Sequence, residues 1–374
     1  MTRRDATRTR PMRRALGGAM PAPGRLGGMT PARRALLGSA AMLAWLPAAV
    51  LAATPTESSP RYAGRDDAMR FADELASRHN LDAGWVRHKL AQARFAPAVT
   101  KLIAPPPTGM QKNWAAYRAR FIEPTRLAAG AAFWQRNESW LTLAEQRYGV
   151  PPAIVIGIVG IETLYGKQMG GFRAIDALAT LAFDFPAGRR DRSAFFRDEL
   201  GALFALAARE RFDVLALKAS YAGALGMPQF MPSSWSRYAI DFDGDGRTDL
   251  HGSGADVIGS VAHYLAESGW QRGRPTHFEV SAPPAEADRA ALLELDIVPS
   301  WNAEYFAERG AVLSDAGKQY DRALALVELQ NGDAAPSYVA GTVNFYAITR
   351  YNWSSYYALA VIELGAAVAR AAGR

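Results

Sequence analysis

A single glutamate stands at the end of one of the most apolar stretches of the sequence. Residues 154–161, IVIGIVGI, leave a helix almost no polar face before Glu162. Burying an ionised carboxylate without a partner costs several kcal/mol, so such a group is either paired with a cation or kept protonated. A carboxyl group that stays protonated near neutral pH can serve as a general acid. Periodicity alone supports almost equally the alternative of a core glutamate that is paired with an arginine.

A second set of acids has the spacing of a calcium-binding loop. The segment DFDGDGRTD, residues 241–249, places aspartates at alternate positions and Gly246 at the sharp turn, as an EF-hand loop does. Gly252 occupies the twelfth position, where an EF-hand loop has a bidentate glutamate, and a longer loop could close at Asp256. The candidate ligands are Asp241, Asp243, Asp245, Arg247 through its carbonyl group, Asp249 and Asp256. The sequence therefore predicts one structural calcium ion, against the alternative of a solvated acidic turn.

Aromatic side chains gather in glycine- and proline-punctuated segments. Sugar rings have apolar faces and hydroxyl rims, which aromatic rings and amides recognise together. As a group these aromatics favour a saccharide site, although core packing is the better explanation of any one taken singly. They are Tyr117, Tyr165, Tyr221, Phe230, Trp235, Tyr351 and Tyr357.

The basic residues are concentrated in the first 52 positions. These hold nine arginines and one acid, whereas residues 53–374 hold 34 lysines and arginines against 35 aspartates and glutamates. The net charge of +7 therefore belongs to the leader and does not indicate a body that binds nucleic acid. With 49% hydrophobic residues, the chain is globular and long enough for two or three domains.

The same leader has the layout of an export signal. Arg33 and Arg34 precede the apolar stretch ALLGSAAMLAWLPAAVL, and the small residue Ala52 suits a cleavage site. We expect a signal peptide over 1–52, a flexible start over 53–63 and a soluble periplasmic protein, with an uncleaved anchor as the alternative. The sequence contains no cysteine, which excludes disulfides, thiol catalysis, cysteine-bound zinc and lipid attachment to an N-terminal cysteine.

Helical periodicity governs most of the chain that must position these residues. Residues 64–149 are predicted to be helical, with Asp82 as an N-cap and breaks at 104–109 and near Pro124. Further helices are expected on both sides of the polar loop DFPAGRRDRS, residues 184–193.

Two glycines lie in the helix that carries Glu162. This helix begins with prolines, which its first turn tolerates. Gly157 and Gly160 should permit a neighbouring element to approach closely.

Residues 272–340 differ from the rest in character. THFEVSA, ALLELDI and ALALVELQNGDAAPSYVAG are predicted to be short strands, and NGD at 331–333 supplies a hairpin turn. The chain returns to helix over 341–374. The prediction is an α+β protein, mainly α, with a small β-rich insertion.

Five segments of the chain form an ordered set: GIETLYG, SYAGALGMPQFMPSSW, DFDGDGRTD, DVIGSVAHYL and NFYAITRYNWSSYYA. Together they resemble the signature blocks of the membrane-bound lytic transglycosylase B family, from about residue 65 to the C-terminus. The resemblance implies a lysozyme-like helical core over 150–271, a helical domain over 64–149 wrapped against it, a small inserted β domain over 272–340 and a C-terminal segment, 341–374, that returns to the core. It also implies cleavage of the MurNAc–GlcNAc β-1,4 bond of peptidoglycan with formation of a 1,6-anhydro-MurNAc end.

Carried over by position, the resemblance implies roles for individual residues. Glu162 matches the family's single catalytic acid/base. The predicted saccharide contacts are Tyr117, Arg189, Arg190, Arg192, Ser220, Gln229, Tyr351, Asn352 and Tyr357. The arginine loop is longer than the family's usual form, so the choice among its three arginines stays open. The calcium loop also belongs to the family, and the missing lipoprotein cysteine implies a soluble member.

Most glycosidases need a second carboxylate as base or nucleophile. Asp184 and Glu199 follow Glu162 in the sequence, but neither lies in a motif to which the family assigns catalysis. One glutamate suffices if the N-acetyl group of MurNAc stabilises the oxocarbenium-like centre and the C6 hydroxyl then gives its proton to the glutamate. The alternatives are a hydrolytic muramidase and a non-catalytic, calcium-stabilised peptidoglycan-binding protein. Expected partners are peptidoglycan strands and proteins of cell-wall synthesis or division, with no nucleic acid, and a monomer is expected.

Overall fold

The structure is a computed structural model, and it describes residues 59–104, 111–188 and 190–374. All of these belong to the unit Ala41–Arg374. The predicted signal peptide, 1–52, lies outside the described residues, as does most of the predicted flexible start, 53–63.

Helices form the N-terminal part, as the periodicity predicts. The carboxylate of Asp82 caps α3 by accepting a hydrogen bond from Trp85 N at 2.6 Å, and α6 begins at Pro124 after a break. Both predictions are confirmed. The elements are η1 (Tyr62–Gly64), α2 (Asp66–His79), α3 (Ala83–Ala91), α4 (Pro97–Ile103), α5 (Trp114–Ala119), α6 (Pro124–Arg136) and α7 (Glu138–Tyr148).

The following helices carry most of the predicted site. They are α8 (Pro152–Thr163), α9 (Ala174–Phe183), α10 (Ser193–Glu210), α11 (Pro232–Tyr238), α12 (Gly254–Glu267), α16 (Val343–Thr349) and α17 (Ser355–Ala371). A short antiparallel ribbon pairs β1 (Phe172–Arg173), which directly precedes α9, with β2 (Lys218–Ala219), which follows α10.

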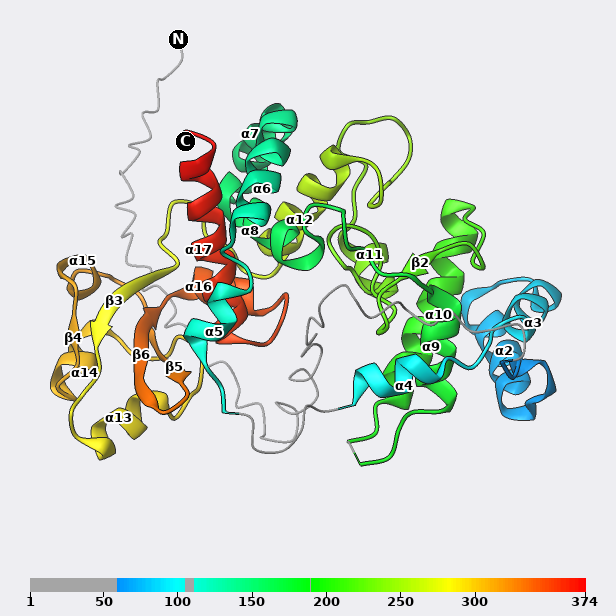
Figure 1. Cartoon of the computed structure of the whole chain (residues 1–374), viewed down its shortest axis with the longest axis horizontal. Helices are drawn as coiled ribbons and strands as arrows, with labels where there is room; N and C mark the ends of the chain where they lie inside the picture. Colours follow the sequence, from blue (N-terminus) through cyan, green and yellow to red (C-terminus); the bar gives the residue numbers. More distant parts are fainter. Residues whose placement is uncertain (1–58, 105–110, 189) are drawn as a thin grey trace, which may run out of the picture. The chain divides into compact units, whose positions relative to one another are not determined.

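Helices α8 and α17 lie side by side although they are far apart in the sequence (Figure 1). A Cβ atom at Gly157 would lie 2.1 Å from the carbonyl oxygen of Val361, and one at Gly365 would lie 1.9 Å from that of Ala153. Glycine therefore lets the two backbones touch. This confirms the close approach predicted at Gly157.

A four-stranded antiparallel sheet, in the order β4-β3-β6-β5, occupies the region after α12. Along β5 the side chains alternate: Leu326 packs with Phe306 in a small separate core, whereas Val327 and Leu329 belong to the main core. The strands and short helices are β3 (His277–Ser281), α13 (Glu286–Leu293), α14 (Ala303–Glu308), β4 (Val312–Leu313), α15 (Asp315–Lys318), β5 (Ala325–Asn331) and β6 (Ala334–Gly341).

The strand predicted over ALLELDI, residues 291–297, is wrong. Its first residues end helix α13, and a turn follows. Alanine, leucine and glutamate are strong helix formers, and a short apolar run does not by itself distinguish a strand from a helix. The hairpin predicted at NGD is confirmed, since β5 pairs with β6 and Gly332 takes a φ of +64°.

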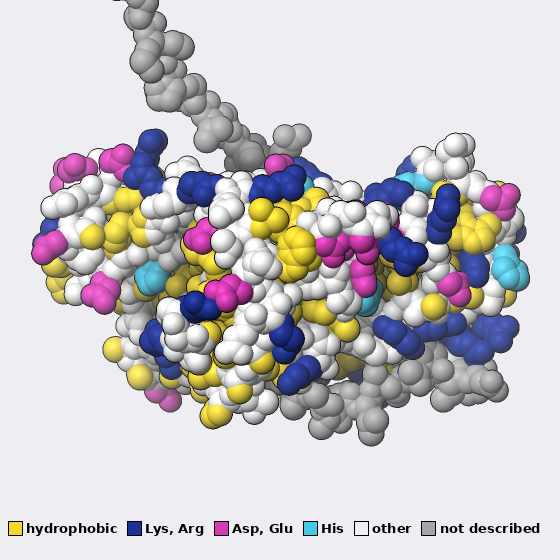
Figure 2. Space-filling model, turned by 90° about the horizontal axis from the view of Figure 1, so that it is seen from above, with side chains coloured by type: hydrophobic (Ala, Val, Ile, Leu, Met, Phe, Trp, Pro, Cys, Tyr) yellow, Lys and Arg dark blue, Asp and Glu magenta, His cyan; other side chains and the backbone are white. Residues whose placement is uncertain are grey.

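Basic and acidic side chains are interspersed on the face of the molecule that Figure 2 shows. In the part of the chain that the structure describes, no helix has both the length and the apolar character that a membrane span requires. The mainly helical α+β class predicted from the sequence is confirmed.

Candidate active site

Glu162 lies at the point where α8 ends. Thr163 is the last helical residue, and residues 164–166 then all take left-handed conformations, with φ values of +50°, +56° and +87°. The Thr163 hydroxyl fixes this turn, since it accepts a hydrogen bond from Gly166 N at 3.1 Å and donates one to the Met227 carbonyl at 2.9 Å. Non-glycine residues seldom adopt such φ values, so the surrounding packing must hold this turn in place.

The carboxyl group of Glu162 differs from an ordinary one in its proton affinity. Its side chain is partly exposed, but the apolar surroundings raise its pKa to about 7. A hydrogen bond from the Tyr357 hydroxyl to Oε1, at 2.7 Å, acts in the opposite direction. Among the described residues Glu162 has no cationic partner, so none of them pairs with it as the alternative of a core glutamate with an arginine requires. A carboxyl group with this pKa can both donate and accept a proton near neutral pH.

Three tyrosines, here called the tyrosine wall, surround this carboxyl group: Tyr117, Tyr351 and Tyr357. The rings of Tyr351 and Tyr357 stack with 6.2 Å between centroids and 14° between planes, and the Tyr351 hydroxyl donates to the Pro228 carbonyl at 2.6 Å. Burial, and after it the Glu162 charge, raises the pKa of all three phenols. The structure thus brings Glu162 together with three of the predicted saccharide contacts.

Three further predicted contacts are found near the tyrosine wall. Ser220 and Gln229 belong to the 220–231 loop, and Asn352 directly follows Tyr351. Ser220 is buried, and its Oγ accepts a hydrogen bond from a backbone N–H of the same loop at 3.1 Å. Gln229 has a left-handed φ of +52°, and its side chain donates to a loop carbonyl at 2.9 Å. The Oδ1 atom of Asn352 is buried without a hydrogen-bond partner among the described residues. Such an atom costs about 1–3 kcal/mol, so it suits a position that a substrate N–H or hydroxyl completes.

The predicted arginine contacts lie in the loop that joins α9 to α10. Arg190 is exposed on this loop, and the Arg192 guanidinium lies 4.5 Å from the ring centroid of Phe195, a cation–π distance. Arg189 lies outside the described residues. Their contact with glycan stays a prediction.

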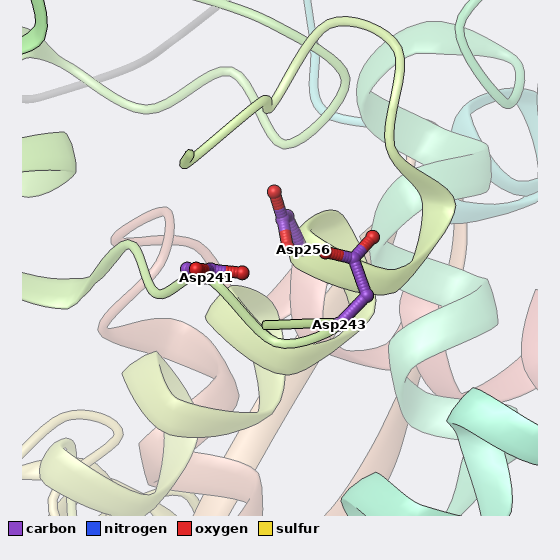
Figure 3. Close-up of side chains that lie close together, drawn as sticks. All are labelled: Asp241, Asp243 and Asp256. Carbon is purple, nitrogen blue, oxygen red and sulfur yellow. The ribbon is translucent and has the colours of Figure 1, made fainter. Parts of the chain in front are cut away.

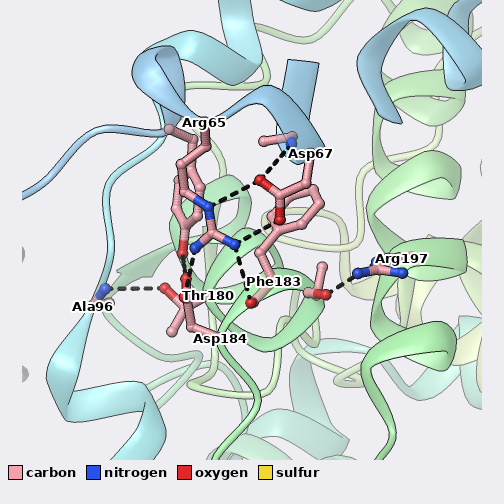
Figure 4. Close-up of polar contacts among 10 residues, drawn as sticks. Arg65, Asp67, Ala96, Thr180, Phe183, Asp184 and Arg197 are labelled. Atoms are coloured by element: carbon pink, nitrogen blue, oxygen red, sulfur yellow. Dashed lines mark hydrogen bonds and ion pairs between the residues drawn. The ribbon is translucent and has the colours of Figure 1, made fainter. Parts of the chain in front are cut away.

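The two acids considered as a second carboxylate are engaged in other contacts. Asp184 accepts hydrogen bonds from the Tyr62 hydroxyl and the Arg65 guanidinium, each at 2.5 Å; Figure 4 shows the network around Arg65. Glu199 is buried and accepts from Ser233 N at 3.0 Å and from Ser233 Oγ at 2.6 Å. Each of these carboxylates therefore joins segments that are distant in the sequence.

Asp176 is closer to Glu162 in the sequence than either of these acids. It is buried on α9, where it accepts hydrogen bonds from Arg173 at 2.6 and 2.7 Å and from Arg94 N at 2.9 Å. A carboxylate with this set of donors belongs to a structural ion pair, so it does not supply the second catalytic acid either.

Three of the six predicted metal ligands converge in the structure. One carboxylate oxygen from each of Asp241, Asp243 and Asp256 lies within 4.8 Å of the others (Figure 3). Asp256 is buried in the first turn of α12, and this burial, together with the charges of the other two, raises the pKa of its carboxyl. A divalent cation would remove the repulsion among them, and a set of oxygen ligands alone suits calcium or magnesium.

The remaining predicted ligands take part in the hydrogen bonds of the loop itself. Asp245 Oδ1 accepts from Arg247 N at 2.9 Å. Asp249 Oδ1 accepts from His251 N at 2.8 Å and from Gly252 N at 2.9 Å, so this carboxylate caps a turn. Asp249 is therefore not among the three that converge.

Tyr356 is an aromatic residue of the site region that was not predicted. Tyr356 packs edge-on against Tyr117 and Trp114, with ring centroids 5.8 and 6.0 Å apart. Consecutive helical residues point about 100° apart, so Tyr356 and Tyr357 face different spaces and Tyr357 is the one that meets Glu162. In the sequence, the two consecutive tyrosines near the start of α17 are the feature that could have indicated both residues.

Comparison with known proteins decides the family. Residues 64–366 match a family model described as the transglycosylase SLT domain. The chain belongs to this family. The transglycosylase is 38% identical over 318 residues to the membrane-bound lytic murein transglycosylase B of Escherichia coli (strain K12), which covers 83% of this chain and 84% of the relative.

Solved structures of lytic transglycosylases are similar to this transglycosylase over most of its length. The structure of Escherichia coli SLT35 in complex with bulgecin A has 37% sequence identity and a TM-score of 0.74. The match covers 84% of this chain and 96% of the SLT35 chain. The same enzyme in complex with calcium is 36% identical, with a TM-score of 0.72 and the same coverage, 84% and 96%. SltB3 of Pseudomonas aeruginosa, in complex with NAG-anhNAM-pentapeptide, is 29% identical with a TM-score of 0.67 and coverage of 79% and 78%. The predicted family, lysozyme-like fold class and enzyme class are confirmed: the chain is a lytic transglycosylase.

Proposed function

We propose that this enzyme cleaves the MurNAc–GlcNAc β-1,4 bond of peptidoglycan with Glu162 as its only catalytic carboxylate. The observation that carries the proposal is the carboxyl group of Glu162, whose pKa is raised to about 7 and which Tyr357 holds within the tyrosine wall. A single catalytic acid is also supported by the other nearby carboxylates in the sequence, which all accept hydrogen bonds from side chains of the protein: Asp176, Asp184 and Glu199. The relative whose bound ligand contains an anhNAM sugar supports the same substrate class.

In the first step, protonated Glu162 gives its proton to the glycosidic oxygen and the bond from that oxygen to C1 of MurNAc breaks. GlcNAc leaves with a free 4-hydroxyl, and the carbonyl oxygen of the MurNAc N-acetyl group stabilises the positive charge that develops at C1. Glu162 is now a carboxylate. The hydroxyl of Tyr357 donates to this carboxylate and stabilises it, because a hydrogen bond to the charged form favours that form.

In the second step, the Glu162 carboxylate takes the proton of the C6 hydroxyl while O6 bonds to C1 and displaces the N-acetyl oxygen. The product is a 1,6-anhydro-MurNAc end, Glu162 is protonated again, and no water is consumed. A well-oriented internal nucleophile has an effective concentration of roughly 10⁵–10⁸ M, which an unpositioned water does not match. We assign Ser220, Gln229, Tyr351 and Asn352 to hold the sugar in the reactive shape.

The alkaline limb of the pH–rate profile should move to higher pH in Tyr357→Phe. Glu162 has to be protonated for the first step, so the rate falls as the pH rises through about 7. The Tyr357 hydrogen bond lowers this pKa, so its loss raises the pKa and keeps the acid protonated to higher pH. Tyr351→Phe is the control, because the Tyr351 hydroxyl donates to Pro228 instead of to Glu162. Initial rates across the neutral and alkaline range measure both midpoints; an unmoved or lowered midpoint in Tyr357→Phe contradicts the assignment.

We also infer that the acidic loop binds one calcium ion with a structural role. The three converging carboxylates supply ligands from both ends of the loop, so an ion there would fix the loop against α12. The structure of a relative in complex with calcium supports this choice of ion. The residues available to it are Asp241, Asp243 and Asp256, with Asp245, the Arg247 carbonyl and Asp249 as further ligands.

Removal of calcium should lower the melting temperature by roughly 5–10 °C. A ligand present at 100 times its dissociation constant stabilises the fold by about 2.7 kcal/mol, and each kcal/mol corresponds to roughly 2–4 °C in a domain of this size class. Calorimetric scans with chelator, and after calcium is restored, measure the shift. Magnesium should restore little, because it demands a tighter octahedral site. No shift in either direction would leave a solvated acidic turn as the explanation.

Incubation of the purified protein with peptidoglycan tests the proposed activity. Release of soluble muropeptides is expected, and it separates an enzyme from a non-catalytic binding protein, which would retain glycan without cutting it. A protein that binds but releases nothing would overturn the proposal. We further propose that the enzyme is exported to the periplasm with cleavage near Ala52, and that it acts there as a soluble monomer on peptidoglycan strands.

A further inference from the structure

A polar cavity lies beside the tyrosine wall but outside the site described above. It has a volume of about 230 Å³, and its walls are β5, the turn after α13, the start of α17 and the segment before α5. Buried Leu326 and Val327 form part of its apolar lining. Its polar side chains are Lys112, Asp296, Glu328, Gln330, Ser355 and Tyr356.

Tyr356 connects this cavity to the tyrosine wall. Its ring meets Tyr117 edge-on, at 5.8 Å between centroids and 84° between planes, and its hydroxyl donates to the Gln330 carbonyl at 3.1 Å. Tyr117 lies close enough to Glu162 for the carboxylate charge to raise its pKa, after the effect of burial. Tyr117 and Tyr356 therefore link the cavity to the Glu162 site, and a substituent of the sugar bound there would have to pass both rings to reach the cavity.

Two exposed charged residues, Lys112 and Asp296, line the open side of the cavity. Within the described ranges, neither the Asp296 carboxylate nor the Lys112 ammonium has a hydrogen-bond or ion-pair partner. Glu328 accepts a hydrogen bond from the Tyr338 hydroxyl at 2.9 Å. Asp296 takes a left-handed φ of +53° in the turn after α13, a conformation that aspartate adopts more readily than most residues do. Two carboxylates and one ammonium group therefore line a single cavity.

We propose that this cavity binds the peptide that peptidoglycan carries on its muramyl sugar. Such a peptide offers amine and carboxylate groups joined by short aliphatic chains. Its ammonium group lies between Asp296 and Glu328, a carboxylate pairs with Lys112, and the aliphatic part packs on the apolar lining. The proposal rests on the proposed function, because its ligand is part of the same substrate.

The test compares glycan strands that carry their peptides with strands from which an amidase has removed them. In the double variant Asp296→Asn, Glu328→Gln, the preference in kcat/KM for peptide-bearing strands should fall about tenfold, since charge-assisted contacts each contribute several-fold to affinity. The loss should appear mainly in KM, as expected for contacts that bind the ground state and transition state alike. Asp333→Asn is the matched control: this acid lies exposed on the turn between β5 and β6, outside the cavity, and its variant should keep the wild-type preference.

A second arm of the experiment needs no variant. Acetylation of the free amines of the peptides removes the ammonium group, and the wild-type enzyme should then lose the same roughly tenfold preference, whereas the double variant should not respond. An unchanged preference in either arm, or a double variant that still responds to acetylation, overturns the proposal for the cavity. Failure of the wild-type protein to release fragments from both kinds of strand would instead overturn the proposed function.

Discussion

Glu162→Gln should leave a folded protein that binds glycan but turns over peptidoglycan about 10²–10⁴-fold more slowly. Glutamine is nearly isosteric with glutamate, and its amide oxygen can still accept the hydrogen bond that Tyr357 donates at 2.7 Å. The amide has no acidic proton for the glycosidic oxygen, and it cannot take the proton of the C6 hydroxyl. Both steps of the reaction therefore fail while the shape of the site is kept. Initial rates of muropeptide release measure the loss.

Glu199 provides the matched control for this substitution. It is also a buried glutamate whose pKa is raised by burial, but its carboxylate accepts hydrogen bonds from Ser233 at 2.6 and 3.0 Å. Glu199→Gln should keep wild-type turnover and change at most the melting temperature. Substantial release by folded Glu162→Gln, or an equal loss in both variants, contradicts the catalytic assignment.

Gly365→Ala should destabilise the fold by about 2 kcal/mol or more and reduce activity with it. The new Cβ would lie 1.9 Å from the carbonyl oxygen of Ala153, a backbone atom that no side-chain rotation can move away. The gain of about 1 kcal/mol in helix propensity from glycine to alanine is smaller than this overpacking cost. Relief of the clash requires α17 to separate from α8, and the hydrogen bond of Tyr357 to Glu162 spans these two helices.

Gly201→Ala is the control for Gly365→Ala, because it makes the same exchange within a helix. At this position the new Cβ would meet only side-chain atoms, His79 Nε2 at 3.2 Å and Leu75 Cδ1 at 3.6 Å, and His79 is exposed and able to move. Its stability should equal that of the wild type or exceed it by up to about 1 kcal/mol, because no backbone clash offsets the gain in helix propensity. Denaturant titration of both variants provides the comparison. A Gly365→Ala protein as stable as the control contradicts the tight backbone contact between α8 and α17.

Features with local causes could be predicted from the sequence. The cap at Asp82, the break at Pro124 and the hairpin around Gly332 each depend on a few consecutive residues. The burial of the helix that carries Glu162 follows in the same way from its apolar run. The strand predicted over 291–297 failed because a short apolar run has no local feature that separates a strand from the end of a helix.

The assembly of the active site could not be derived from spacing, because its parts come from distant segments. Tyr357 meets Glu162 across 195 positions of the sequence, and Tyr117 joins them from α5 only through tertiary packing. The family resemblance suggested these residues; the periodicity did not. In the acidic loop, the sequence predicted Asp241, Asp243 and Asp256 as ligands, and these three converge; it did not predict that Asp249 caps a turn.

The mass of the released muropeptide ends tests the single-glutamate mechanism most directly. Closure by the C6 hydroxyl gives 1,6-anhydro-MurNAc ends, which are lighter than the reducing MurNAc ends of hydrolysis by the mass of one water. Mass spectrometry of the fragments that the purified wild-type protein releases should show predominantly the lighter ends. Predominantly hydrated ends would mean that water attacks C1, and they would contradict a mechanism in which Glu162 acts alone with the C6 hydroxyl of the substrate.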